Sequence, residues 1–244
     1  MRKHHAGWIV ILALCSTAAV ATSVVAIRRS NELIVGTDSL FLSTGTPVLG
    51  CKIRHDNGVY IAAAGLATNP ATLFDAYRLA LPVRHRRTVA DSSRAFMLIA
   101  KPHLERALEN IRTDYPEFFK SKISPMAEPL GVLFFGFDGK VPRFVYVYFN
   151  VPNYFARHIK TRMRYNSCPE SACPFGESVK LFGERRAAQQ AFMVTPREID
   201  DVETIRRMIE AQKAATPDRV NGPVEIIDID SKGFHWPQNK LNCQ

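Results

Sequence analysis

Thr22 is the residue with the clearest potential for chemistry, because it follows a segment typical of a secretory signal peptide. That segment, residues 1–21, has positive charge at its start, an apolar run over residues 8–14 and a small-residue end, Ala-Val-Ala. Cleavage after Ala21 would give Thr22 a free α-amine beside its β-hydroxyl. One residue would then carry both a nucleophile and its own base.

Such chemistry needs further groups around the threonine. The hydroxyl must lose its proton to a base as it attacks, and an α-amine with an ordinary pKa of about 7.7–8.0 suits that role near neutral pH. A buried lysine would lower the pKa of the amine, a carboxylate would hold the lysine, and backbone N–H groups would stabilise an oxyanion. Candidates are Lys52, Asp38 and Gly65. Taken singly, each is typical of a solvated strand or a turn.

From Thr22 onward, the chain resembles β-type proteasome subunits and their bacterial two-component relative, which are N-terminal nucleophile hydrolases. The resemblance rests on Thr22 itself, the Gly-Thr-Asp-Ser step at 36–39, Lys52, and the Ala-Gly step at 64–65. It covers nearly all of residues 22–236. It implies that Thr22 is nucleophile and base, that Asp38 orients Lys52, and that Gly65 contributes an N–H to the oxyanion hole.

Three features depart from the family pattern. Asp218 to Gly222 resembles the family's Asp-x-x-Ser-Gly, which supports the terminal amine; Asp218 fits it, and Asn221 replaces the serine. Glu184 stands where the family has the serine of a Gly-Ser-Gly step, and it could alter the protonation of the amine, crowd the site or point elsewhere. A signal peptide takes the place of the usual propeptide.

The composition bounds the compartment and the partners. The 244 residues carry a net charge of +9, two of whose positive charges lie in the leader, and 46% of them are hydrophobic. A basic surface attracts nucleic acid, anionic lipid or acidic polymers, but no nucleic-acid motif occurs, so we expect no nucleic-acid partner. No second apolar run is long enough for a membrane span, so we expect no stable span after cleavage. We expect a periplasmic or secreted protein.

The cysteines agree with export. Cys15 lies in the leader, and an even number, four, remains in the exported chain. An even count in such a chain favours disulfides, and we predict a Cys168–Cys173 loop with Cys51–Cys243 as the remaining pair. The cysteine and histidine spacings do not indicate a metal site. No metal or organic cofactor is expected.

The pattern of elements predicts one α+β domain over residues 22–244. Apolar runs and turn pairs predict hairpins at 24–37, 51–64, 131–151 and 224–236, and a strand at 179–182. Helical spacing predicts helices at 70–81, 88–115, 183–193 and 195–215, the last opened by a capping box at Thr195. Runs of hairpins between runs of helices agree with the four-layer αββα sandwich that the resemblance implies. Residues 150–178 are interpreted as an insertion.

Two functions follow as expectations. In the first, the protein is an exported threonine-type hydrolase of peptide or amide bonds that self-associates. In the second, it is an inactive proteasome-like scaffold with a structural or ligand-binding role.

Overall fold

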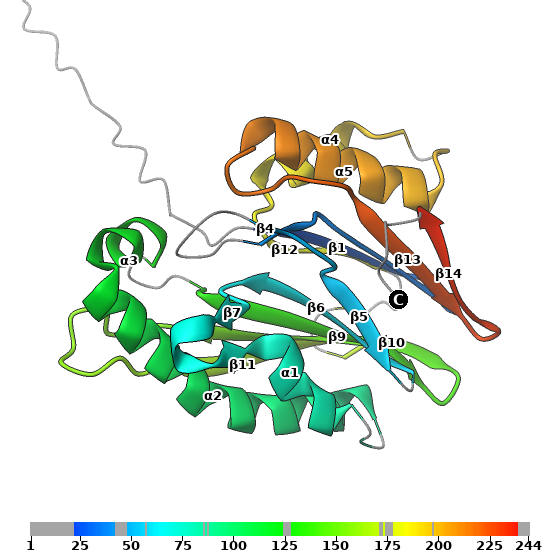
Figure 1. Cartoon of the computed structure of the whole chain (residues 1–244). Helices are drawn as coiled ribbons and strands as arrows, with labels where there is room; N and C mark the ends of the chain where they lie inside the picture. The colour runs from blue at the N-terminus through cyan, green and yellow to red at the C-terminus, as the bar shows by residue number, and fades with distance from the viewer. Residues whose placement is uncertain are drawn as a thin grey trace, which may run out of the picture.

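Two five-stranded antiparallel sheets lie face to face, with helices on their outer faces (Figure 1). A computed structural model describes residues 22–41, 48–56, 58–84, 86, 88–123, 128–170, 173, 178–196 and 198–238. The first sheet has the strand order β12-β1-β2-β13-β14, and the second has the order β11-β10-β9-β6-β5. The predicted α+β class is confirmed.

The first sheet is built from apolar strands near both ends of the chain. Its strands are β1 (Ser23–Arg28), β2 (Glu32–Thr37), β12 (Ser178–Gly183), β13 (Glu225–Asp230) and β14 (Gly233–Gln238). Every residue of β1 is buried, so its sequence does not alternate. A strand covered on both faces has this continuous apolar pattern. The predicted hairpins β1–β2 and β13–β14 are both present.

The second sheet carries the other two predicted hairpins. Its strands are β5 (Ile53–Asp56), β6 (Val59–Gly65), β9 (Leu130–Asp138), β10 (Val141–Asn150) and β11 (Arg162–Cys168). Strand β11 lies inside the segment that we interpreted as an insertion, and sequence analysis missed it. Most of its first five residues are exposed, so it lacks the apolar alternation that marks a strand.

Helices and three apolar clusters complete the fold. Helices α1 (Ala76–Ala80), α2 (Val89–Asp114) and α3 (Pro116–Lys122) lie on the second sheet's side, and α4 (Arg186–Val194) and α5 (Asp201–Ala215) lie on the first sheet's side (Figure 1). One cluster fills the space between the sheets, and one lies beneath each helical layer. Short strands complete the list: β3 (Leu40–Phe41), β4 (Val48–Leu49), β7 (Thr68–Asn69) and β8 (Phe74–Asp75).

Several predicted helix bounds are wrong. Residues 70–81 are not one helix, because Leu73 takes a left-handed φ of 56° between the 3₁₀ turns and strand β8. Helix α1 begins only after Asp75, whose side chain caps it. Helix α5 begins after Asp200 and not at the predicted capping box, since the Asp200 carboxylate accepts from the Glu203 N–H. Residues 116–122, which lie outside every predicted element, form α3.

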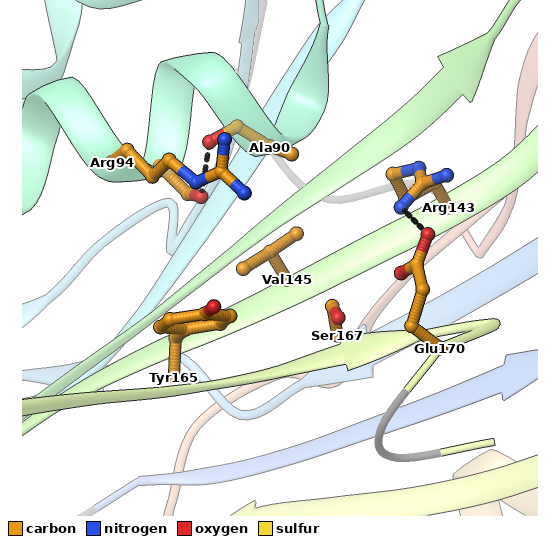
Figure 2. Close-up of a pocket in the computed structure, with 8 residues that line it drawn as sticks. Ala90, Arg94, Arg143, Val145, Tyr165, Ser167 and Glu170 are labelled. Carbon is orange, nitrogen blue, oxygen red and sulfur yellow. Dashed lines mark hydrogen bonds and ion pairs between the residues drawn. The ribbon is translucent and has the colours of Figure 1, made fainter.

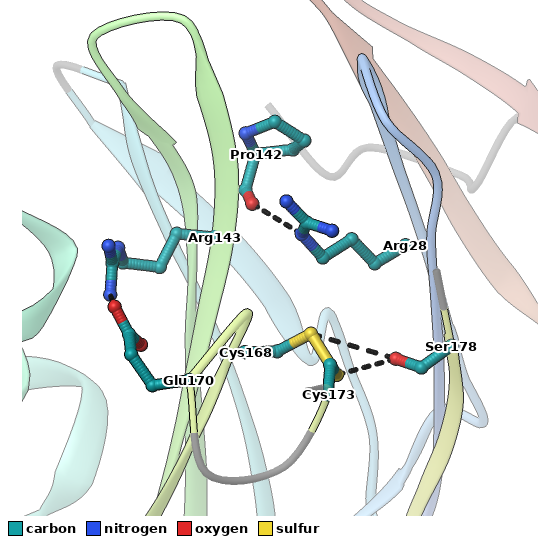
Figure 3. The surroundings of a disulfide bond; sticks show 7 residues. All are labelled: Arg28, Pro142, Arg143, Cys168, Glu170, Cys173 and Ser178. Atoms are coloured by element: carbon teal, nitrogen blue, oxygen red, sulfur yellow. Dashed lines mark hydrogen bonds and ion pairs between the residues drawn. A yellow bond between two sulfur atoms is a disulfide. The ribbon is translucent and has the colours of Figure 1, made fainter. Parts of the chain in front are cut away.

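A disulfide joins Cys168 at the end of β11 to Cys173, as predicted (Figure 3). The Ser178 hydroxyl, at the start of β12, lies 2.6 Å from the Cys173 sulfur, so this loop bridges the edges of the two sheets. Cys51 is also disulfide-bonded. Its predicted partner, Cys243, lies outside the described residues.

Over the described part of the chain, no helix has the length and apolarity needed to cross a membrane.

Candidate active site

Thr22 lies buried where strand β1 begins, with 2% of its surface exposed. Its carbonyl oxygen accepts a hydrogen bond of 2.8 Å from the Glu184 N–H. Gly183 makes this approach possible: its φ is 72°, and a Cβ there would lie 2.0 Å from the Thr22 carbonyl oxygen. Only glycine fits such a position, so the end of β12 is shaped to hold the backbone of Thr22.

Lys52 joins the threonine hydroxyl to a carboxylate. Its ammonium nitrogen Nζ donates to Thr22 Oγ1 at 2.5 Å and to Asp38 Oδ1 at 3.0 Å. The whole lysine is buried, and burial lowers its pKa, while the nearby Asp38 carboxylate opposes that decrease. A lysine that contacts the hydroxyl and loses its proton more readily than usual is suited to move that proton.

Asp38 is held by four donors. Its Oδ1 accepts from the Ser23 N–H at 3.0 Å as well as from Lys52, and its Oδ2 accepts from the N–H groups of Leu40 and Asn221 at 3.1 and 3.2 Å. A fully buried ion pair is tolerated when such hydrogen bonds satisfy its remaining lone pairs. The arrangement fixes the carboxylate, which in turn fixes the lysine.

The backbone of Lys52 is clamped from both sides. The carboxylate oxygen Oε2 of Glu225 accepts from the N–H groups of Lys52 and Ile53, both at 2.9 Å. The Tyr77 hydroxyl donates to the Lys52 carbonyl at 2.8 Å. Sequence analysis missed both residues. For Glu225 a signal existed: it is an acidic residue inside the apolar run from Val224, and it is fully buried.

The C-terminal motif reaches the site with its backbone. The Asn221 N–H donates to Asp38, but the Asn221 side chain turns into its own loop, where it contacts the Pro217 carbonyl and the Gly222 N–H. The side chain of Asp218 is 69% exposed, and its carboxylate lies 3.7 Å from Arg219 Nε. Among the described contacts, neither side chain touches Thr22.

Glu184 is paired with an arginine that sequence analysis had passed over. Arg219 Nη1 donates to Glu184 Oε1 at 2.8 Å, and only 12% of the Glu184 side chain is exposed. The guanidinium therefore neutralises the Glu184 carboxylate. The pair lies beside Thr22, because the Glu184 N–H donates to the Thr22 carbonyl.

Gly65 ends β6 close to these groups. A Cβ built on Gly183 would lie 3.4 Å from the Cβ of Ala64, which places the end of β6 beside Gly183. Gly65 has a φ of 96°, and a Cβ there would lie 2.4 Å from the Pro129 carbonyl oxygen. The predicted oxyanion-hole glycine is thus at the edge of the site in a conformation that favours glycine.

A separate cavity of about 420 Å³ lies between α2 and the outer face of β10 and β11 (Figure 2). Arg143 in its wall is paired with Asp138 and Glu170. The cavity lies on the face of the second sheet that is turned away from the first sheet, so it is distinct from the Thr22 site. Within the described residues, no group of three or more His, Cys, Asp or Glu is placed to hold a metal ion.

No protein-family model and no curated protein matches the sequence. Solved structures do match. An Anbu mutant from Hyphomicrobium sp. strain MC1 aligns with a TM-score of 0.52 at 13% identity, over 90% of this chain and 86% of that one. Thiobacillus denitrificans BPH in complex with epoxomicin aligns with a TM-score of 0.44 at 14% identity, over 85% of this chain and 98% of that one. The first similarity, at 13% identity, shows that this chain shares the fold of the Anbu structure.

Proposed function

We propose that the protein is an exported hydrolase of peptide or amide bonds whose nucleophile is Thr22, freed by signal-peptide cleavage. The observation that carries this proposal is the position of Lys52 Nζ, which bonds both Thr22 Oγ1 and Asp38 Oδ1 in a fully buried setting. The proposal includes the αββα sandwich of N-terminal nucleophile hydrolases, self-association, and a mechanism without metal or organic cofactor.

The proposed reaction has two stages. The α-amine of Thr22 takes the hydroxyl proton as Oγ1 attacks the substrate carbonyl carbon, and backbone N–H groups, that of Gly65 among them, meet the oxyanion. The C–N bond then breaks, and the leaving amine takes the proton, which leaves an ester on Thr22. The amine next activates a water molecule. That water cleaves the ester, releases the carboxylic acid and restores the threonine hydroxyl.

The disulfides agree with an oxidising compartment outside the cytoplasm, which the signal peptide also predicts.

The alternative is an inactive scaffold with a structural or ligand-binding role. Its support is the orientation of Asp218 and Asn221, whose side chains have no described contact with Thr22. We favour the hydrolase, because a scaffold has no need for a buried Lys52–Asp38 pair aimed at one hydroxyl. Burying such a pair is costly unless it is well satisfied.

The first test is the N-terminal sequence and intact mass of the exported protein. We expect a chain that begins at Thr22. Hydrolysis of peptide amides by that protein should fall on the order of 10³-fold or more in Thr22→Ala, whereas Thr22→Ser, which keeps a hydroxyl and an amine, should retain part of the activity. A chain that begins elsewhere, or equal rates for wild type and Thr22→Ala, would contradict the hydrolase and favour the scaffold.

A further inference from the structure

The loop between β10 and β11, residues 151–161, is held in place by helix α2. Glu105, Glu109 and Arg112 follow one another at helical spacing and bond to the backbone of this loop. Arg112 donates to two loop carbonyl groups at 2.7 and 2.6 Å, and Glu109 and Glu105 accept from loop N–H groups at 2.5 and 2.7 Å. The bonded groups are the carbonyls of Ala156 and Arg157 and the N–H groups of Ile159 and Thr161. One face of a helix therefore fixes the course of the loop.

Phe155 lies on this loop with its ring in a defined orientation. The ring meets that of Tyr154 edge-on, with 5.1 Å between the centroids, and Tyr154 stacks on Phe119 of α3 at 5.0 Å. Phe119 is buried, yet 86% of Phe155 is exposed. An exposed apolar side chain is ordinary by itself. A ring that its neighbours already orient, however, loses little side-chain entropy when a partner binds it.

Four exposed cations follow Phe155 along the chain. They are Arg157, Lys160, Arg162 and Arg164. Lys160 pairs with Glu105 at 3.4 Å, whereas the three arginines form no ion pair within the part of the chain that the structure describes. We call Phe155 and these four cations the aromatic–basic surface.

The aromatic–basic surface lies at one end of the second sheet. Asn150 pairs with Arg162, so the β10–β11 loop closes the end at which β10 stops and β11 starts. Figure 1 shows this loop at the outer edge of the molecule, below α3 and far from the turn between β9 and β10. The carboxylates that contact the loop, Glu105 and Glu109, also pair with Lys160 and Arg112. An excess of positive charge thus remains beside the exposed ring.

An exposed ring beside uncompensated cations fits the surface of an anionic bilayer. Aromatic side chains are favoured at the level of the lipid headgroups, and each Lys or Arg near an anionic bilayer tightens binding about fivefold. An acidic peptide would neutralise the cations but would give the ring no apolar partner. Single-stranded nucleic acid binds best in a groove that follows its backbone, whereas this loop lies at an outer edge. A bilayer accommodates both the ring and the charges at once.

We propose that the aromatic–basic surface binds the protein to anionic lipid bilayers, with the Phe155 ring among the headgroups and the four cations against the lipid phosphates. The binding is peripheral, because it uses one ring and surface charges. None of these residues belongs to the Thr22 site described above, so the interaction is independent of the proposed hydrolase.

Co-sedimentation of the exported protein with lipid vesicles tests this proposal. One set of vesicles contains phosphatidylcholine alone, and the other contains about 30% phosphatidylglycerol to supply negative charge. We expect binding to the anionic vesicles to be about tenfold tighter or more at low ionic strength, and to weaken as salt is added. Every variant has the same N-terminus, so a leader that stayed attached would contribute equally to all of them.

Two variants separate the ring from the charges. Phe155→Ser should weaken binding to anionic vesicles about tenfold, because the apolar ring no longer leaves water. Arg157→Gln with Arg162→Gln should weaken it about 25-fold, which is about fivefold for each charge. All three side chains are exposed, so the Tm of each variant should match that of the wild type.

Matched controls remove the same groups elsewhere. Val194→Ser changes an apolar side chain that is 81% exposed at the end of α4, on the first sheet's side. Lys140→Gln with Lys232→Gln removes two exposed charges from the turns between β9 and β10 and between β13 and β14. Both controls should bind anionic vesicles within about threefold of the wild type, since neither touches the aromatic–basic surface.

Four outcomes would overturn the proposal. The first is equal binding to neutral and anionic vesicles. The second is a loss in the lysine control as large as in the arginine variant, which would mean that net charge alone attracts the protein. The third is a larger loss in Val194→Ser than in Phe155→Ser, which would place the contact on α4. The fourth is a single-stranded RNA 20-mer that binds more tightly than the vesicles and depends on Arg157 and Arg162 but not on Phe155.

Discussion

At the scale of single residues, Lys52 is the group on which the chemistry depends. Replacing it by methionine removes the only cation bonded to Asp38 in the described contacts and leaves a buried carboxylate unpaired. We expect Lys52→Met to lose peptide hydrolysis on the order of 10³-fold, and to lose about 3–5 kcal/mol of unfolding free energy. Urea unfolding of both proteins measures the second effect. The double variant Asp38→Asn with Lys52→Met should recover part of the lost stability, because it also removes the negative charge that the single variant leaves buried and unpaired.

The lowered pKa of Lys52 also predicts how stability depends on pH. The unfolded chain, with an ordinary lysine, binds more protons than the folded chain at pH values between the folded pKa and about 10.4. Folding free energy from this group therefore becomes more favourable as the pH rises through that window. The unfolding free energy of wild type minus that of Lys52→Met should rise between pH 8 and 10. A flat or falling difference would contradict the lowered pKa.

Glu184 and Arg219 carry opposite charges, so replacing one or the other should shift the pKa of the terminal amine in opposite directions. With Glu184→Gln, Arg219 loses its ion pair with Glu184 but keeps its contact with Asp218, so the charge beside Thr22 becomes more positive and lowers the pKa of the terminal amine. With Arg219→Gln, the Glu184 carboxylate stays without the guanidinium and raises the pKa of the terminal amine. The acid limb of kcat/KM should move to lower pH in the first variant and to higher pH in the second, each on the order of half a pH unit. Glu210→Gln, on the exposed side of α5, is the control. Shifts of the same sign would show that the pair does not act through charge.

At the scale of the elements, the start of β5 is positioned by a strand from the other sheet. Glu225 on β13 accepts the N–H groups of Lys52 and Ile53, so it fixes where the strand that follows the lysine begins. Glu225→Ala leaves two buried donors unsatisfied and should cost about 2–5 kcal/mol of unfolding free energy. Glu225→Gln keeps an acceptor oxygen and should restore most of the stability and the hydrolysis rate. If the glutamine variant is as impaired as the alanine variant, the charge of Glu225 matters and not its role as an acceptor.

Local patterns predicted those elements whose own residues specify them. Asn-Gly and Asp-Gly turns and apolar runs predicted the hairpins. Thr22, Asp38 and Lys52 were named as candidates because their spacing resembles that of a known family, and the structure places the three side chains in contact. Strand β11 was missed because it lies at the edge of a sheet, where most of its first residues are exposed and no apolar alternation marks a strand. The helix over 70–81 was wrong because the chain turns at Leu73, which has a left-handed φ and whose N–H bonds to the Pro70 carbonyl and not onward along a helix. Tyr77 and Arg219 reach the site from distant segments without a local signal, whereas Glu225 could have been marked as an acidic residue inside an apolar strand.

At the scale of the whole molecule, a short disulfide loop lies where the edges of the two sheets meet. The Cys168–Cys173 loop ends β11 in one sheet and leads into β12 in the other, so it limits how far these edges can separate. Closing so short a loop contributes about 2 kcal/mol in the chain-entropy account, which for a chain of this size corresponds to about 4–8 °C in Tm. Cys168→Ser with Cys173→Ser should therefore unfold at a Tm lower by about that amount. Dithiothreitol added to this double variant reduces the disulfide of Cys51, because the Cys168–Cys173 disulfide has been removed. Any further change in Tm then measures the contribution of the Cys51 disulfide. A double variant that unfolds at the wild-type Tm would contradict a structural role for the loop.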